Sequence, residues 1–85
     1  MRPEGQATNE SIYYVISDKP LHLQKSNSTS SAVLDEIPTQ TAVKSVYKTK
    51  NGWFEVTYKD KKGYVSGQYL RTKAEYDRYK TLVST

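Results

Sequence analysis

Hydrophobic and polar residues alternate along most of this chain in short runs. The runs are rich in Val, Ile and aromatic residues, which is typical of strands with one buried face. We expect strands at 12–16, 21–24, 33–37, 42–47, 53–58 and from 64 onwards. Segments rich in Ser, Asn, Asp, Gly and Pro separate these runs and predict turns. Five to six short strands, with a turn every eight to twelve residues or so, predict a small all-β barrel or sandwich.

The strand expected at 42–47 has two possible registers. The inward set is either Val43, Ser45 and Tyr47, or Ala42, Lys44 and Val46. Because side chains alternate between the two faces of a strand, a slip by one residue would exchange these two sets. The sequence leaves both registers open.

The most specific stretch is 51–70, which reads NGWFEVTYKDKKGYVSGQYL. Asn51-Gly52 predicts a tight hairpin, because both residues tolerate positive φ. The chain is expected to turn again at KDKKG, so that 53–58 pairs with the strand beginning at Tyr64. Gly63 between these aromatic strands predicts a close approach by a ring or another backbone.

Both ends of the chain differ from the middle. Residues 1–11 are polar and show no periodicity, which predicts a flexible N-terminal arm. The segment 73–85 is rich in helix-forming residues, and three residues are spaced three and four apart: Tyr76, Tyr79 and Val83. We therefore expect one domain at 12–72, followed by a C-terminal extension that is either a short helix or a linker.

Composition narrows the class of protein. The chain has 85 residues, of which 35% are hydrophobic, and this suits one small domain. It contains eight Tyr, one Trp and one Phe, whose rings fit a half-buried sheet. It has no Cys, which excludes disulfides and a thiolate zinc site. No apolar run is long enough for a membrane-spanning helix, and residues 1–10 lack the apolar stretch of a signal peptide.

The charge pattern favours anionic partners only in a general way. Thirteen Lys and Arg against nine Asp and Glu give a net charge of +4. The lysines are scattered over every segment, as on an ordinary solvated surface. The motif YKDKKGY at 58–64 interleaves lysines with aromatic residues, as nucleic-acid binders do. A lysine-rich hairpin tip more commonly protects a sheet edge from aggregation, so nucleic acid is not the expected partner.

Catalytic chemistry finds no support in the sequence. The single histidine, His22, takes the outward position of an alternating strand, where a solvated imidazole is expected. Without a Cys or a second His, no nucleophile and base can pair. The acids are dispersed and form neither a general acid–base pair nor a metal cluster. We expect no catalytic residue, no metal and no cofactor.

The segment from about 14 to 70 resembles the bacterial Src-homology 3 (SH3) family, most specifically at 51–70. In the first half the matching residues are Leu21, Leu23, the Ser-rich loop, Val33 and Ile37. In the second half they are Asn51, Gly52, Trp53, Phe54, Val56, Gly63, Tyr64, Val65, Tyr69 and Leu70. The resemblance implies a small, partly open SH3-like β-barrel with a 3-10 turn at SGQYL before the last strand. In this resemblance Gln40 stands where the family usually has a turn Gly, and Ser45 where it has an inward Val.

The resemblance also implies a non-catalytic binding module. In cell-wall-targeting relatives the ligand is peptidoglycan, usually its peptide part, and a cell-envelope or secreted location follows. The alternative is a module that binds a peptide segment of a protein partner, for which a cytoplasmic location stays open. A monomer is expected for the isolated domain.

The expected groove combines the loop 25–31 with aromatic residues, some of which must be exposed because a barrel this small cannot enclose them all. The candidate ligand-binding residues are Tyr13, Tyr14, Ser28, Tyr47, Trp53 and Tyr64. For Trp53 a purely structural role in the scaffold stays open. Tyr69 and Leu70 are expected in the core.

Overall fold

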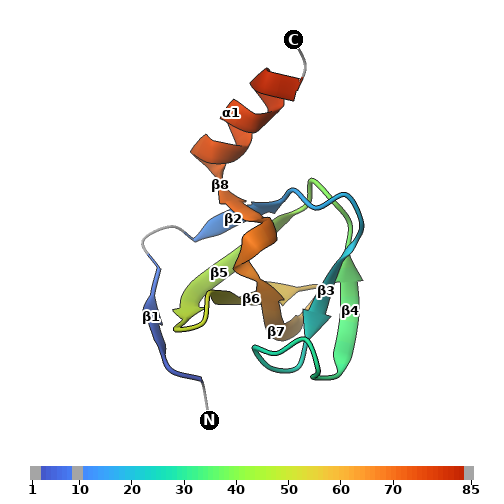
Figure 1. Ribbon diagram of the computed structural model, residues 1–85, viewed down its shortest axis with the longest axis vertical. Helices are drawn as coiled ribbons and strands as arrows, with labels where there is room; N and C mark the ends of the chain where they lie inside the picture. Colours follow the sequence, from blue (N-terminus) through green and yellow to red (C-terminus); the bar gives the residue numbers. More distant parts are fainter. Residues whose placement is uncertain (1–2, 9–10, 84–85) are drawn as a thin grey trace.

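The computed structural model describes residues 3–8 and 11–83. Its elements follow the chain in this order: β1 (Gly5–Ala7), β2 (Ile12–Val15), β3 (Leu21–Gln24), β4 (Val33–Ile37), β5 (Ala42–Thr49), β6 (Trp53–Tyr58), β7 (Lys61–Ser66), the 3-10 turn η1 (Gly67–Tyr69), β8 (Leu70–Thr72) and α1 (Lys73–Val83). The strands curl into one barrel, and α1 projects from one end of it (Figure 1). The 3-10 turn predicted before the last strand is present, and the C-terminal extension contains a helix.

All strand pairs are antiparallel, in the order β4-β3-β7-β6-β5-β2-β8. This arrangement confirms the expected all-β, SH3-like barrel. The sheet has eight strands rather than five or six. The two short additions are β8, which pairs with β2, and β1, which pairs with β5.

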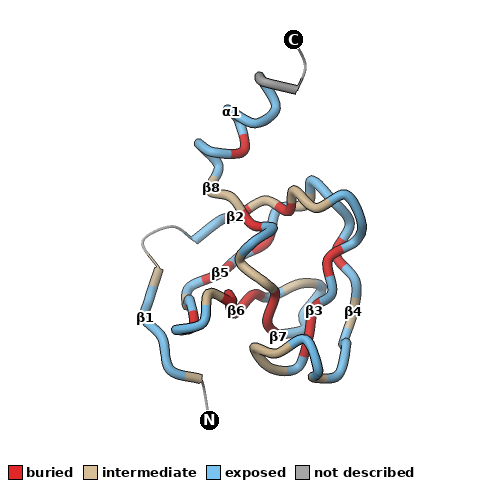
Figure 2. Tube along the Cα trace, viewed as in Figure 1, coloured by how far each residue is buried: buried red, intermediate tan, exposed pale blue. Residues whose placement is uncertain are grey.

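The core lies where the inward faces of these strands meet, and Figure 2 shows buried positions gathered on the barrel strands. Its members are almost all aliphatic or aromatic: Tyr13, Val15, Leu21, Leu23, Ile37, Val43, Phe54, Val56, Val65 and Leu70. Burial of such side chains stabilises the fold by about 25 cal/mol per Å² of apolar surface.

The register of β5 follows the first of the two possibilities at Val43 and Ser45, whereas the inward position expected for Tyr47 is wrong. Val43 and Ser45 are buried, whereas Lys44 and Val46 are exposed. The pairing with β6 shifts between Ser45 and Tyr47, which is the signature of a bulge. Tyr47 is therefore only half-buried.

The two predicted hairpins both form, with different turn geometries. In the first, the Gly52 N–H donates to the Thr49 carbonyl (3.0 Å) and Gly52 has φ 90°. Among 50–52 only Gly52 has positive φ, although Asn51 would tolerate it as well. In the second hairpin Lys59 and Asp60 both take positive φ, 49° and 65°. Gly63 is approached closely, as predicted, because an added Cβ would lie 2.7 Å from the Gln24 carbonyl oxygen.

The N-terminal segment is more regular than its composition suggests. We expected residues 1–11 to form an arm without regular structure, and for Gly5–Ala7 this expectation is wrong. These residues form β1 and pair with Thr49, Lys48 and Tyr47 of β5. Polar composition did not reveal the strand, because its pairing depends on a backbone edge and on the small size of Gly5. Residues 1, 2, 9 and 10 of the arm lie outside the described part.

Helix α1 docks on the barrel through one aromatic contact. The Tyr76 ring is buried and stacks on Tyr14 of β2, with ring centroids 4.4 Å apart and planes 5° from parallel. The rest of α1 whose side chains are described is exposed. Within 3–8 and 11–83, no helix has the length and apolar character needed to span a membrane.

Candidate functional site

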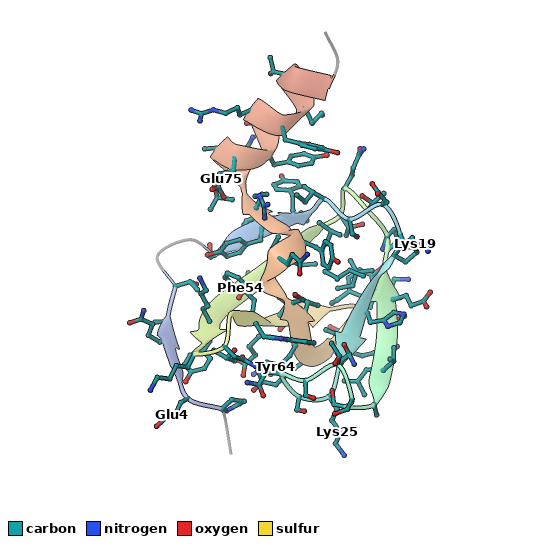
Figure 3. The ribbon with its side chains drawn as sticks, viewed as in Figure 1. Glu4, Lys19, Lys25, Phe54, Tyr64 and Glu75 are labelled. Atoms are coloured by element: carbon teal, nitrogen blue, oxygen red, sulfur yellow. The ribbon has the colours of Figure 1, made fainter. Side chains whose placement is uncertain are left out.

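An open groove of about 600 Å³ runs along one side of the barrel. Its surface is mostly apolar, and it is built from four separate parts of the chain. These are the turn before β3 together with β3, the loop after β3 together with β4, the start of β6, and the end of β7 with η1. The lining residues are Ser17, Asp18, Lys19, Pro20, Leu21, His22, Gln24, Thr29, Glu36, Trp53, Ser66 and Tyr69. Figure 3 shows Lys19 on the turn that leads into β3.

Two aromatic side chains give the groove its character, and it is called the Trp53–Tyr69 groove below. Trp53 opens β6 and pairs in register with Ser66 of β7. Its side chain is largely buried, whereas Tyr69 on η1 is 37% exposed. Aromatic surfaces of this kind bind apolar groups and the flat faces of peptide bonds.

Local structure holds η1, and with it Tyr69, against the hairpin that precedes Trp53. The Gly67 N–H donates to the Gly52 carbonyl (3.0 Å), and the Ser66 hydroxyl caps η1 by accepting from the Gln68 N–H (3.4 Å). An added Cβ on Gly67 would lie 2.2 Å from the Gly52 carbonyl oxygen, so this approach requires glycine. The motif SGQYL thus holds η1, which carries Tyr69, against Gly52, the residue before β6.

A donor and an acceptor on two of the groove-lining residues have no partner within the described part of the chain. Trp53 uses its backbone N–H, which donates to the Thr49 hydroxyl (3.0 Å), but its indole N–H makes no hydrogen bond there. The Gln24 side-chain amide donates to the carbonyls of Thr29 (3.1 Å) and Ser31 (3.0 Å), and its oxygen is left to accept. No buried side-chain polar atom of the described residues lacks a partner, so both groups are open to solvent.

The loop between β3 and β4 is ordered by hydrogen bonds from its own polar side chains. The Ser31 hydroxyl donates to the carbonyls of Ser26 and Ser28, at 3.1 and 2.7 Å. Asn27 and Asn51 form a reciprocal pair in which each side-chain amide donates to the other residue, both at 3.0 Å. This pair ties the loop to the β5–β6 hairpin, so the wall that contributes Thr29 to the groove is supported from two sides.

The charges around the groove are mixed in sign. The lining contains two acidic residues, Asp18 and Glu36, and two basic residues, Lys19 and His22. The His22 imidazole lies 3.4 Å from the Glu36 carboxylate. Both of these side chains are more than half exposed, so an ion pair between them contributes little to stability. A groove with both signs of charge does not resemble the uniformly basic channel that binds a nucleic-acid backbone.

The charged tip of the β6–β7 hairpin is engaged within the protein. Lys61 donates to the Asp35 carboxylate (3.0 Å), and this hydrogen bond lowers the pKa of Asp35 below its ordinary value. The Asp35 carboxylate also accepts from the Glu36 N–H (2.8 Å), which lowers the pKa further. Lys61 thus joins two distant hairpins of the barrel.

Only Trp53, of the six predicted ligand-binding residues, lines this groove. Tyr13 is buried in the core, where its ring packs on Phe54 with centroids 4.9 Å apart. Tyr14 stacks on Tyr76 of α1. Ser28 belongs to the loop beside the groove, and its hydroxyl lies 2.8 Å from that of Ser30.

The other two predicted residues belong to a polar row that crosses four neighbouring strands. Its members are paired in register from β3 to β5: Gln24, Tyr64, Glu55 and Tyr47. The Tyr64 hydroxyl donates to the buried Glu55 carboxylate (3.1 Å), and the Tyr47 hydroxyl donates to the Pro3 carbonyl (2.7 Å). Both tyrosines therefore have structural partners, and only Gln24 of this row reaches the groove.

Tyr69 is one of the groove residues that sequence reasoning missed, and Gln24 is another. Tyr69 was expected in the core with Leu70; Leu70 is buried there, but Tyr69 is exposed. The signal was the 3-10 turn itself, because such a tight turn does not continue the alternation of a strand. The turn directs two adjacent residues to unrelated environments.

Comparisons with known proteins agree with this geometry. The family model described as "Bacterial SH3 domain" matches residues 21–71, more than half of the chain. Among solved structures, that of NlpC2 from Trichomonas vaginalis is similar, with a TM-score of 0.63 and 14% identity. The match covers 74% of this chain and 23% of that one, and at this identity it shows the fold. No curated protein matches the chain. The chain therefore belongs to the bacterial SH3 domain family, a family of non-catalytic binding modules.

Proposed function

We propose that this chain binds the peptide part of bacterial cell-wall peptidoglycan in the Trp53–Tyr69 groove and tethers a larger protein to the cell envelope. The observation that carries this proposal is the combination of two aromatic side chains with an unused donor and an unused acceptor. A peptide requires this combination, because its backbone presents carbonyls and N–H groups in turn along an extended chain.

The two polar groups have complementary tasks. The indole N–H of Trp53 donates to a ligand carbonyl, while the side-chain oxygen of Gln24 accepts from a ligand N–H. Because Thr29 and Ser31 hold the Gln24 amide nitrogen, the oxygen is already oriented before the ligand arrives. Such preorganisation reduces the entropy that binding costs.

The mixed charges of the groove favour a peptide over a polyanion. Stem peptides of the cell wall carry both carboxylates and amino groups. Lys19 of the lining suits the carboxylates, and Asp18 and Glu36 suit the amino groups. The net charge of +4 attracts anionic wall polymers to the rest of the surface. Salt at 0.1 M largely screens this attraction beyond a distance of about 10 Å. Groove binding and surface attraction therefore differ in their salt dependence.

The test is co-sedimentation with purified peptidoglycan sacculi at low and at high salt. We expect pelleting that persists at high salt and that Tyr69→Ala weakens about tenfold, which corresponds to about 1.4 kcal/mol. Trp53→Phe keeps the ring but removes the indole N–H, and we expect a smaller loss. Tyr79→Ala is the matched control, since Tyr79 is 36% exposed, close to the 37% of Tyr69, and lies on α1 outside the groove.

Two further arms separate the ligand chemistries. Tyr64→Phe removes the hydroxyl that donates a hydrogen bond to the Glu55 carboxylate. This variant is expected to be less stable but to pellet as the native chain does. Sacculi whose stem peptides have been removed by an amidase should no longer retain the protein. Absence of pelleting at either salt, or equal losses in Tyr69→Ala and Tyr79→Ala, would contradict the proposal.

A peptide segment of a protein partner is the second candidate. It is favoured by the same donor and acceptor, because neither group distinguishes a stem peptide from an extended protein segment. Its ligand would be sought by peptide-array binding, again with Tyr69→Ala and Tyr79→Ala as the pair of variants.

A further inference from the structure

The outer edge of β5 is shared by two separate segments. β2 pairs with its first half, at Ala42–Lys44, and β1 pairs with its second half, at Tyr47–Thr49. β5 has eight residues and β2 only four, so β2 by itself would leave the second half of this edge unpaired. An unpaired strand edge presents free N–H and C=O groups to any extended chain that can reach it.

The arm, residues 3–8, occupies this half of the edge mainly through its backbone. The Lys50 N–H donates to the Glu4 carbonyl (2.7 Å), and the Thr8 N–H donates to the Val46 carbonyl (3.1 Å). All three residues of β1 are exposed, and Figure 2 shows this strand as an exposed stretch beside the barrel. The ion pair between Lys50 and Glu4 spans 3.7 Å with both side chains more than 80% exposed, so it adds little.

Segments held by backbone bonds with few buried contacts open more readily than the core. The arm is therefore the part of the sheet whose place another strand can take. None of its residues lines the Trp53–Tyr69 groove, so exchange at this edge leaves that groove intact.

The edge is selective for the residue that faces Thr49. An added Cβ on Gly5 would lie 2.1 Å from the Lys48 carbonyl oxygen and 2.7 Å from the Thr49 Cα, both backbone atoms that cannot turn away. Pro3, two residues before Gly5 in the arm, accepts a hydrogen bond at its carbonyl from the Tyr47 hydroxyl (2.7 Å). On either side of the glycine there is room, since an open hollow of about 780 Å³ lies between residues 3–6 and 47–50.

We propose that the edge of β5 at residues 46–50 is an acceptor site for an extended peptide segment of a partner protein, which adds as an antiparallel strand. The segment carries a glycine in register with Thr49, as Gly5 of the arm does. The arm occupies the site in cis until such a segment displaces it. Figure 3 shows Glu4 at the outer side of this arm.

The experiment compares the whole chain with its Gly5→Ala and Gln6→Ala variants by NMR. Gly5→Ala introduces the backbone clash, while Gln6→Ala changes an exposed neighbour without one. We expect the Lys50 amide to exchange with solvent about tenfold faster in Gly5→Ala, with the core amides unchanged. In Gln6→Ala the Lys50 amide should remain as protected as in the native chain.

The second measurement adds a synthetic peptide with the sequence of residues 3–8, Pro-Glu-Gly-Gln-Ala-Thr, to each protein. We expect it to bind Gly5→Ala weakly, with a Kd of about 1 mM and shifts confined to 46–50. It should bind the native chain about tenfold less well, because the tethered arm competes at an effective concentration of about 10 mM, roughly ten times this Kd. The same peptide with its own Gly5→Ala change should not bind either protein.

Several results would overturn the proposal. A Lys50 amide equally protected in all three proteins would mean that the arm does not leave the edge. Equal binding of the two peptides would remove the glycine requirement. A protein mass that doubles with concentration would assign the edge to the arm of a second copy rather than to a partner protein.

Discussion

At the scale of single residues, Gln40 is one of three residues other than glycine in the described part of the chain that take positive φ. It has φ 65° in the turn between β4 and β5, and its N–H donates to the Val15 carbonyl (2.6 Å). Residues other than glycine pay about 1–2 kcal/mol for this left-handed conformation. The family that the chain resembles usually has a glycine at this position. A Gln40→Gly substitution should therefore remove the conformational strain at this turn.

We therefore expect Gln40→Gly to raise the free energy of unfolding by about 0.5–1 kcal/mol, after the larger unfolded-state entropy of glycine is subtracted. Urea denaturation followed by Trp53 fluorescence measures the change. Thr39→Gly is the matched control, because Thr39 has no positive φ and should lose stability instead. A gain of equal size in both variants would contradict the argument from backbone strain.

Some glycines and amides in this chain have roles that sequence neighbours decide, and others have roles that distant segments decide. Gly52 was predictable as a turn residue, since Asn-Gly between two strand patterns is a local signal. The roles of Gly5 and Gly67 were not, because each is required by a backbone carbonyl that belongs to a distant segment. The same holds for Asn51, whose partner Asn27 lies across the barrel surface in another loop.

At the scale of elements, α1 begins with a reciprocal cap. The Glu75 N–H donates to the Thr72 hydroxyl (3.3 Å), and the Thr72 N–H donates to the Glu75 carboxylate (3.0 Å). This backbone hydrogen bond lowers the pKa of Glu75 below its ordinary value. A group whose pKa is lower in the folded state stabilises that state above its unfolded pKa, and this contribution is lost as the pH falls through the folded pKa.

The cap predicts how α1 responds to acid. Amide protection in α1 should stay constant from neutral pH to about pH 5 and then decline as the pH falls past the ordinary glutamate pKa towards the lower pKa of Glu75 in the folded state. Glu75→Gln should keep a cap without this titration, since glutamine also fits the capping box. Thr72→Ala should weaken the helix by about 1 kcal/mol at every pH. An acid response of α1 unchanged in Glu75→Gln would contradict this account.

Strand positions were largely predictable at this scale, because half-buried strands alternate in composition. β6 does not alternate simply between buried and exposed residues, since four consecutive residues from Trp53 to Val56 are buried. Phe54 and Val56 join the core, whereas Glu55 is buried on the opposite face beside Tyr64. The loop between β3 and β4 is rich in Ser and Asn, which predicted a loop but not its internal order. The side-chain hydrogen bonds that order it form only in the folded protein.

At the scale of the whole molecule, the coupling between barrel and helix rests on a small contact. Figure 1 shows α1 extending away from the strands. Tyr76 on α1 is buried against Tyr14 of β2, and Tyr79 continues the aromatic contact at 6.5 Å from Tyr76. Stacked pairs of this kind contribute about 0.5–1.5 kcal/mol beyond the area that they bury.

Hydrogen exchange over the whole chain tests this coupling. Tyr14→Ala should increase exchange in α1 about tenfold, while amides at the centre of β5, β6 and β7 change less, since they exchange through global unfolding. Tyr79→Ala, which removes an exposed ring, should have a smaller effect on α1. If Tyr14→Ala leaves α1 protected, the helix is held by contacts other than the Tyr14–Tyr76 stack.

The sequence by itself determined the all-β class, the positions of the barrel strands, both hairpins, the 3-10 turn and the resemblance to bacterial SH3 domains. These features depend on residues close together in the chain, through side-chain alternation and turn chemistry. Only the tertiary structure decided which aromatic residues reach the groove, which register β5 adopts and where residues 5–7 pair. Those outcomes depend on segments that meet only after folding: the Trp53–Tyr69 groove joins four parts of the chain, and the arm pairs only because Gly5 can approach the backbone of β5.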